Sequence, residues 1–100
     1  TCGPGAETVQ CDLTRADWSL LLDGIDAVVH LAGIPRDAPW EALDTANVQV
    51  TRGLIDAAVA AGVRRFVFAS SVHVVGNAPA DVRLDDAMPL QPDGPYGWSK

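Results

Sequence analysis

Two short apolar runs with a long helical pattern between them constrain the fold of this 100-residue chain more than any other feature. The runs cover residues 26–33 and 65–71, and they are apolar on both faces, as strands buried in a parallel sheet are. Between them, apolar residues recur at helical spacing over about residues 40–61, and Gly62 ends the pattern. This order predicts a right-handed βαβ unit and an α/β fold with a mostly parallel sheet.

The flanking segments carry weaker signals. Residues 7–13 are interpreted as a short strand, and Thr14 and Asp17 form a capping box that predicts a short helix after Thr14. Glycines and prolines punctuate residues 72–95, which predicts a loop, and a further helix is expected to begin at about Tyr96.

Composition narrows the function classes. A chain that is 48% hydrophobic and 20% charged is ordinary for a soluble protein and long enough for one domain. The net charge is −6 and the basic residues are scattered, which argues against nucleic acid or a membrane surface as a partner. Cys2 and Cys11 lack metal-ligand spacing, so we expect no metal site, two reduced thiols and a cytoplasmic protein.

The strongest chemical signal is the pair Tyr96 and Lys100, the sole tyrosine and the sole lysine of the chain. Residues four apart on a helix share one face, so the phenol and the ammonium are expected to lie together. A nearby cation favours the phenolate of a tyrosine, whose free pKa is about 10, and so prepares it for acid–base catalysis. The alternative is an accidental pair on a solvated helix.

Two further polar residues occupy informative positions. Ser71 ends an apolar run 25 residues before Tyr96 (96 − 71), where its hydroxyl could hold a reacting oxygen or could satisfy loop backbone. Asn47 falls on the apolar stripe of the long helix, so its amide must be hydrogen-bonded. A structural role for Asn47 and a role in ordering an active site are compatible.

Taken together, these motifs resemble the extended short-chain dehydrogenases, also called the NAD-dependent epimerase/dehydratase family. The resemblance covers about residues 9–100, in order and with plausible spacing. The segments that carry it are Asp12-Leu13, His30-Leu31-Ala32-Gly33, Asn47 with residues 53–58, residues 66–71, and Tyr96-x-x-x-Lys100.

The resemblance implies cofactor contacts in two places. Asp12 matches the acidic residue whose carboxylate meets the adenine amino group, with the amide of Leu13 beside it. Leu31, Ala32 and Gly33 match the strand end that packs along the ribose and phosphates of the cofactor.

The resemblance also implies a set of catalytic residues. Asn47 matches an asparagine near the nicotinamide, Ser71 the serine that positions the substrate, and Tyr96 the tyrosine that transfers the proton. Lys100 matches the lysine that holds the nicotinamide ribose and assists Tyr96. Within the family the nearest likeness is to uronate dehydrogenases, in which the positions of Ser71 and His73 touch the sugar acid.

The likeness to uronate dehydrogenases has two departures. Pro35 and Val72 stand where those enzymes commonly have serine and asparagine, and both changes remove polar contacts to the substrate. His73 is therefore either a substrate contact or a loop histidine at the rim of a pocket.

The resemblance implies a Rossmann-like, doubly wound parallel sheet of which residues 1–100 are the central part, truncated at both ends. The three expected strands would be the third, fourth and fifth of that sheet. The family's Gly-x-x-Gly-x-x-Gly turn, which binds the pyrophosphate at a helix N-terminus, does not occur in the chain, so the first βαβ portion is missing.

Three functions follow as alternatives. The first is an NAD(P)-dependent oxidoreductase that transfers a hydride to or from a sugar or sugar-acid carbon, with Tyr96, Lys100 and Ser71 as its acid–base group. The second is a nucleotide-sugar epimerase or dehydratase that keeps its NAD. The third, of another class, is a non-catalytic regulator or an inactive fragment. The expected cofactor is NAD, with NADP left open, and a homodimer of the full-length protein is also left open.

The isolated chain of residues 1–100 is expected neither to bind NAD measurably nor to catalyse a reaction, and to be poorly soluble or partly unfolded. The physical reason is that it has no glycine turn for the pyrophosphate and leaves an apolar strand edge unpaired. Calorimetric titration with NAD and a thermal melt of the expressed chain measure this. A soluble monomer with one sharp transition and micromolar NAD affinity would contradict it.

Overall fold

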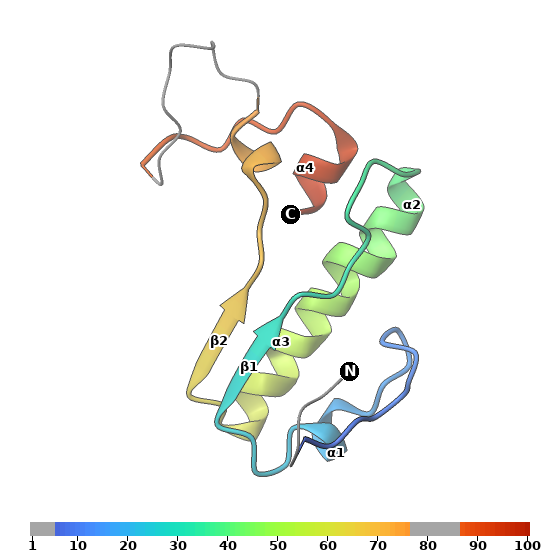
Figure 1. Cartoon of the computed structure of the whole chain (residues 1–100), viewed down its shortest axis with the longest axis vertical. Coiled ribbons are helices and arrows are strands. Elements are labelled where there is room, and N and C mark those ends of the chain that lie inside the picture. The colour runs from blue at the N-terminus through green and yellow to red at the C-terminus, as the bar shows by residue number, and fades with distance from the viewer. Residues whose placement is uncertain (1–5, 77–86) are drawn as a thin grey trace.

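The computed structural model describes residues 6–76 and 87–100, and within them the fold is built on a parallel pair of strands (Figure 1). Strand β1 (Ala27–His30) pairs with strand β2 (Arg65–Phe68) in parallel, with Ala27 opposite Arg65 and His30 opposite Phe68. The helix that joins them packs against the sheet. The predicted α/β class and the strand–helix–strand unit are therefore confirmed.

The connecting helix is one continuous rod with a π-helical segment inside it. Helix α2 (Trp40–Leu43) leads into the π-helix η1 (Asp44–Gln49), which leads into helix α3 (Val50–Ala61). The expected span of 40–61 is confirmed. The π-helical segment was not foreseen, and such insertions widen a helix by one residue per turn, often at functional sites.

A small core lies between the sheet and the helices. Leu22, Leu54 and Ala58 are buried, and Trp18, Val28 and Phe66 pack against them from helix α1 (Trp18–Leu21) and the two strands. Burying a leucine side chain contributes about 1.5–3 kcal/mol, so the inward face of α3 holds the sheet in place.

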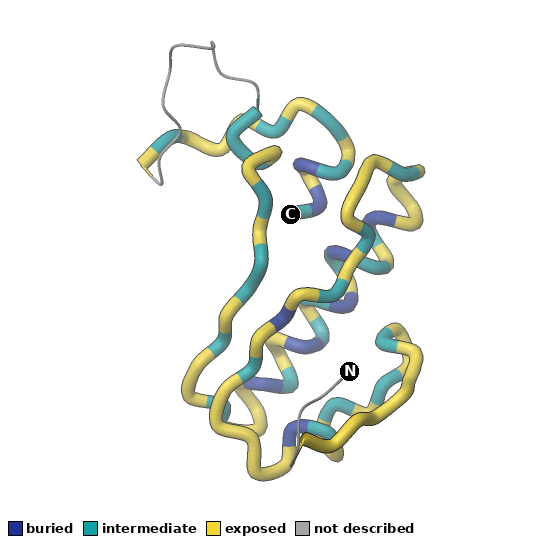
Figure 2. The backbone as a smooth tube through the Cα atoms, in the orientation of Figure 1, coloured by how far each residue is buried: buried dark blue, intermediate teal, exposed yellow. Residues whose placement is uncertain are grey.

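The other face of the sheet is open to solvent among the described residues. Val29 is 62% exposed and its neighbour across the ladder, Val67, is 52% exposed, while Leu31 just after β1 is 71% exposed. Figure 2 shows exposed residues alternating with less exposed ones along both strands. Parallel sheets are usually covered on both faces. The apolar side chains on this exposed face are of the kind that a covering element normally buries.

In the N-terminal region the predicted strand is wrong, while the predicted short helix is confirmed with a different N-cap. Residues 6–13 form no strand, because the described sheet consists of β1 and β2 and this segment pairs with neither of them. Helix α1 begins after Asp17, whose carboxylate accepts the amide of Leu20 at 3.4 Å. Thr14 does not cap it, because the helix begins only at Trp18; the amide and hydroxyl of Thr14 donate instead to Asp12, at 2.9 and 2.7 Å.

The C-terminal elements follow the strand ends. The 3₁₀ helix η2 (Val72–Val75) interrupts the predicted loop, and helix α4 (Pro95–Ser99) begins one residue before the expected start. The part of that loop formed by residues 77–86 lies outside the described residues, as does Cys2, whereas Cys11 is an exposed free thiol. In the described ranges no helix is both long and apolar enough to cross a membrane.

Replacing two glycines of the long helix and its C-cap with alanine is expected to change the stability of the fold in opposite directions. Gly62 adopts φ 77°, which a side chain disfavours, so Gly62→Ala should destabilise the fold by about 1 kcal/mol. Gly53 lies inside α3 with space for a methyl group, so Gly53→Ala should stabilise it by about 0.5–1 kcal/mol. Denaturant unfolding of both variants of the full-length protein measures the difference. Equal shifts for the two variants would contradict this account.

Candidate active site

Polar side chains gather where both strands end. The loop after β1, the segment after β2 and helix α4 meet at this end of the sheet (Figure 1). In parallel α/β sheets ligands bind outside the carboxyl ends of the strands, so this is where a ligand is expected. Most of the residues singled out from the sequence come together here.

Ser71 and His73 form a hydrogen-bonded pair at the start of η2. Ser71 caps this short helix, and its Oγ accepts the backbone amide of His73 at 3.2 Å. The same Oγ lies 2.9 Å from Nδ1 of His73, in a second hydrogen bond. Both residues therefore have fixed side chains on the surface that follows β2.

Tyr96 lies against this pair. The rings of His73 and Tyr96 meet edge to face, with centroids 5.3 Å apart and planes at 73°. Because the imidazole is already held by Ser71, the contact fixes the tyrosine ring as well. The structure thus brings Ser71, His73 and Tyr96 together from two segments more than twenty residues apart in sequence.

Lys100 approaches the same region from the end of α4. Its Nζ lies 4.8 Å from the centroid of the Phe68 ring, and its carbonyl accepts the hydroxyl of Ser70 at 3.4 Å. Burial lowers the pKa of the Lys100 ammonium, since a partly desolvated cation is less stable than one in water. The aromatic face offsets part of that cost.

Asn47 is the buried link between the loop after β1 and helix α4. Its Oδ1 accepts the amide of Ile34 at 2.7 Å, while its Nδ2 donates to the Ile34 carbonyl at 3.1 Å and to Ser99 Oγ at 2.8 Å. The Ser99 hydroxyl in turn donates to the Tyr96 carbonyl at 2.7 Å. The prediction of a satisfied polar residue on the apolar stripe is confirmed, and Asn47 is only 2% exposed.

The strand end after β1 is exposed and lies close to a cation. Leu31 is exposed, and Gly33 lies so near Asn47 that a Cβ there would come within 2.5 Å of the amide oxygen. That same Cβ position is 3.9 Å from Lys100 Nζ, so the ammonium lies over a stretch of bare backbone. A small, exposed strand end beside a cation suits a ribose and its phosphates.

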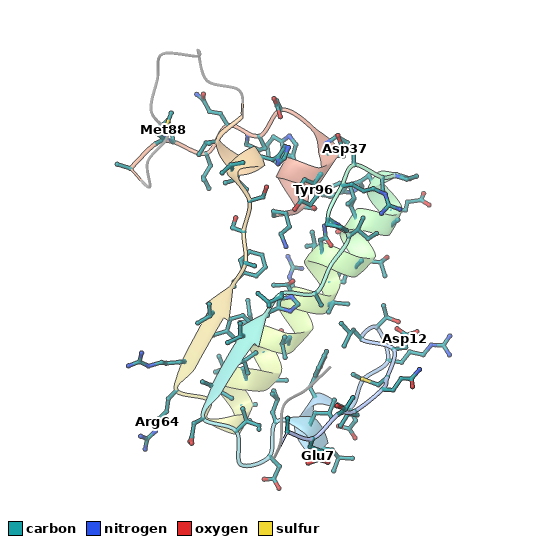
Figure 3. The ribbon with its side chains drawn as sticks, viewed as in Figure 1. Glu7, Asp12, Asp37, Arg64, Met88 and Tyr96 are labelled. Carbon is teal, nitrogen blue, oxygen red and sulfur yellow. The ribbon has the colours of Figure 1, made fainter. Side chains whose placement is uncertain are left out.

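Asp12 and Leu13 lie apart from this cluster. Figure 3 shows Asp12 on the N-terminal segment, away from Tyr96. Asp12 is exposed. Hydrogen bonds from the hydroxyl and the amide of Thr14 lower the pKa of its carboxyl, which therefore stays ionised. An extended cofactor is the kind of ligand that could reach both places.

Sequence reasoning missed two residues of the site. Gly97 is buried, and a Cβ on it would lie 2.6 Å from the His73 carbonyl oxygen, so the absence of a side chain lets α4 approach η2. Asp37 accepts the backbone amide of Tyr96 at 2.9 Å across 59 residues of sequence. The glycine between Tyr96 and Lys100 was a usable signal, whereas an exposed aspartate in a loop was not.

The sequence of the chain matches a known protein family and several curated relatives. The model of the NAD-dependent epimerase/dehydratase family matches residues 2–100. The chain is 43% identical over 95 residues to a uronate dehydrogenase of Agrobacterium fabrum, covering 94% of this chain and 36% of that protein. The chain thus spans little more than a third of the length of the curated relatives it matches.

Solved structures agree with these relatives. The crystal structure of a uronate dehydrogenase from Agrobacterium tumefaciens superposes with a TM-score of 0.86 at 42% identity, covering 99% of this chain and 38% of that chain. A UDP-glucuronic acid 4-epimerase from Bacillus cereus, in complex with NAD, gives 0.83 at 29% identity, covering 91% and 30%. Both support a Rossmann-like fold of the short-chain dehydrogenase and epimerase type for the matched segment.

Replacing Asn47 with leucine is expected to destabilise the fold by about 2–4 kcal/mol. The change leaves the amide of Ile34 and the hydroxyl of Ser99 without their buried partner, and unsatisfied buried groups cost about 1–3 kcal/mol each. The matched control is Gln49→Leu, because Gln49 lies exposed in the same π-helical segment. Denaturant unfolding of both variants measures this, and equal losses of stability would contradict the assigned role of Asn47.

Proposed function

We propose a function from the premise that the chain belongs to the NAD-dependent epimerase/dehydratase family, whose model matches residues 2–100. The proposal is that it forms the central part of the cofactor-binding domain of an NAD-dependent oxidoreductase that acts on a sugar or sugar acid. The open apolar face of the sheet, formed by Val29 and Val67, supports a place inside a larger α/β domain.

The observation that carries the proposal is the meeting of Tyr96 with the Ser71–His73 pair. A proton-transferring group needs a fixed position near the oxygen it serves. Tyr96 has a fixed ring, since it packs on His73, and Lys100 follows at the C-cap of its helix. We assign Tyr96 as the acid–base residue, Ser71 as the group that orients the substrate oxygen, and His73 as a substrate contact.

The residues present fit NAD. Leu31, Ala32 and Gly33 would lie along its ribose and phosphates, with Lys100 at the nicotinamide ribose and Asn47 behind Gly33. Asp12 and Leu13 would meet the adenine. Bound NAD supplies a two-electron acceptor or donor for the sugar carbon, and NADP remains an alternative.

In the oxidation direction, the chain's own groups handle the hydroxyl of the sugar. Ser71 holds the oxygen and Tyr96 takes its proton, as the carbon is oxidised to a carbonyl. We assign the ammonium of Lys100, which follows at the C-cap of α4, the role of stabilising the phenolate that forms. Reduction runs through the same contacts, with Tyr96 returning the proton.

Uronate oxidation is the first candidate for the reaction. The 43% identity to the uronate dehydrogenase of Agrobacterium fabrum supports it, and the Ser71–His73 pair offers hydrogen-bonding groups for a sugar acid. A second candidate is the epimerisation of a nucleotide sugar, supported by the likeness to the Bacillus cereus 4-epimerase. Release of NADH on incubation with free glucuronate favours the first candidate. NAD retained through purification, with interconversion of nucleotide sugars, favours the second.

Location, partners and oligomeric state of the full-length protein are also proposed. We propose that the full-length protein, meaning this chain with any flanking sequence that its gene encodes, works in the cytoplasm on small molecules and not on nucleic acid or membranes. We also propose that these 100 residues alone are inactive. A homodimer is a further option for the full-length protein.

In the full-length protein, Tyr96→Phe is expected to lower kcat by about 10² or more, the range for losing a positioned acid–base group. Lys100→Ala should lower kcat and also weaken NAD binding. Steady-state kinetics with glucuronate and a fluorescence titration with NAD measure these effects. The matched control is Trp98→Phe, an aromatic exchange at an exposed position of the same helix. A Tyr96→Phe enzyme within threefold of the wild type would refute the catalytic assignment.

A further inference from the structure

We propose that Asp37 is a positioning residue, which sets the place of Tyr96 by holding the first free amide of helix α4. This inference rests on the proposed function, because it concerns the placement of the proposed acid–base residue. Asp37 lies in the loop after β1 and Tyr96 lies 59 residues later, yet the carboxylate Oδ1 accepts the Tyr96 amide at 2.9 Å. Figure 3 shows the two residues at the same end of the molecule.

The sequence of α4 leaves its N-terminus without a cap of its own. The N-cap position is Gly94, which has no side chain to accept a hydrogen bond, and the next residue, Pro95, has no amide to donate. The amide of Tyr96 is therefore the first donor of the helix. Asp37 supplies from another segment the acceptor that an aspartate or serine at the N-cap would normally supply.

Helix α4 is consequently held at two points by the chain that follows β1. Asp37 binds the amide of Tyr96 at the beginning of the helix, and Asn47 binds the hydroxyl of Ser99 near its end. Asn47 is itself bonded to both backbone groups of Ile34, three residues before Asp37. The helix that carries Tyr96 is thus tied to the strand end where the cofactor is proposed to bind.

The two holds differ in what they control. The bond from Asn47 is buried and fixes the distance of α4 from the long helix. The bond from Asp37 is exposed and acts directly on the residue whose ring packs on His73, so it governs the direction of that ring. Losing it should leave the fold in place and displace Tyr96 from Ser71.

The test compares Asp37→Ala with Asp37→Asn in the full-length protein, by kcat and KM for glucuronate and NAD. Asp37→Ala is expected to lower kcat about tenfold, with both KM values within about twofold of wild type. Asp37→Asn keeps an amide oxygen in place of Oδ1, and asparagine caps helices as well as aspartate does, so it should stay within about threefold of the wild-type kcat.

A second-site control separates positioning from helix stability. Gly94→Ser gives α4 a local cap, and Gly94 has an extended backbone (φ −158°) with Asp37 as the neighbour that its Cβ would meet, at 3.6 Å. Added to Asp37→Ala, Gly94→Ser should raise Tm and leave kcat low. Each kcat is measured well below the Tm of its variant. If Asp37→Ala alone does not fold, the double variant provides the comparison with wild type.

Three outcomes would overturn the inference. The first is a wild-type kcat for folded Asp37→Ala, and the second is a double variant in which kcat recovers together with Tm. The third is an active Tyr96→Phe enzyme, which would also refute the proposed function. If Tyr96→Phe is inactive while Asp37→Ala is fully active, the proposed function stands and only the positioning role fails.

Discussion

The buried amide of Asn47 is the interaction on which the site depends. A polar group inside an apolar helix face is costly unless it is hydrogen-bonded, and Asn47 meets this condition with Ile34 on one side and Ser99 on the other. These partners belong to the loop after β1 and to helix α4. One side chain therefore joins the strand end, the long helix and the helix of Tyr96. The π-helical segment that contains Asn47 widens the helix at this point, as such segments do elsewhere near functional sites.

The parts of the fold that follow from local periodicity could be predicted from the sequence. The strand–helix–strand unit and the stop at Gly62 have patterns that arise within about forty residues. The segment at residues 7–13 failed for the opposite reason, because a strand exists only where another strand offers a ladder. The helix start after Thr14 was wrong, because the carboxylate of Asp17 caps α1 while the hydroxyl of Thr14 bonds to Asp12. A side chain with two available partners cannot be assigned from spacing alone.

The residues of the candidate site likewise divide into those that the sequence pointed to and those that only the structure reveals. Tyr96, Lys100, Ser71 and Asn47 could be singled out from the sequence because each is either rare in the chain or polar at an otherwise apolar position. Asp37 was not found, since an exposed aspartate in a loop is ordinary and its partner lies 59 residues away. Residue type and spacing point to groups that perform chemistry, whereas the groups that position them emerge only from contacts between distant segments.

Two features of its surroundings act in opposite directions on the charged form of Lys100. Partial burial disfavours the ammonium and lowers its pKa, while the Phe68 ring beneath it attracts the cation. His30 lies close enough for the charge of Lys100 to matter, although burial is the larger cause of its lowered pKa. Both effects keep the imidazole neutral, and Thr51 provides its hydrogen-bonding partner at 2.8 Å. With His30 neutral, Lys100 is a positive charge at this strand end, where a phenolate or a cofactor phosphate would be the favourable partner. The weak hydration of the ammonium then becomes an advantage, because less water must be removed before it meets an anion.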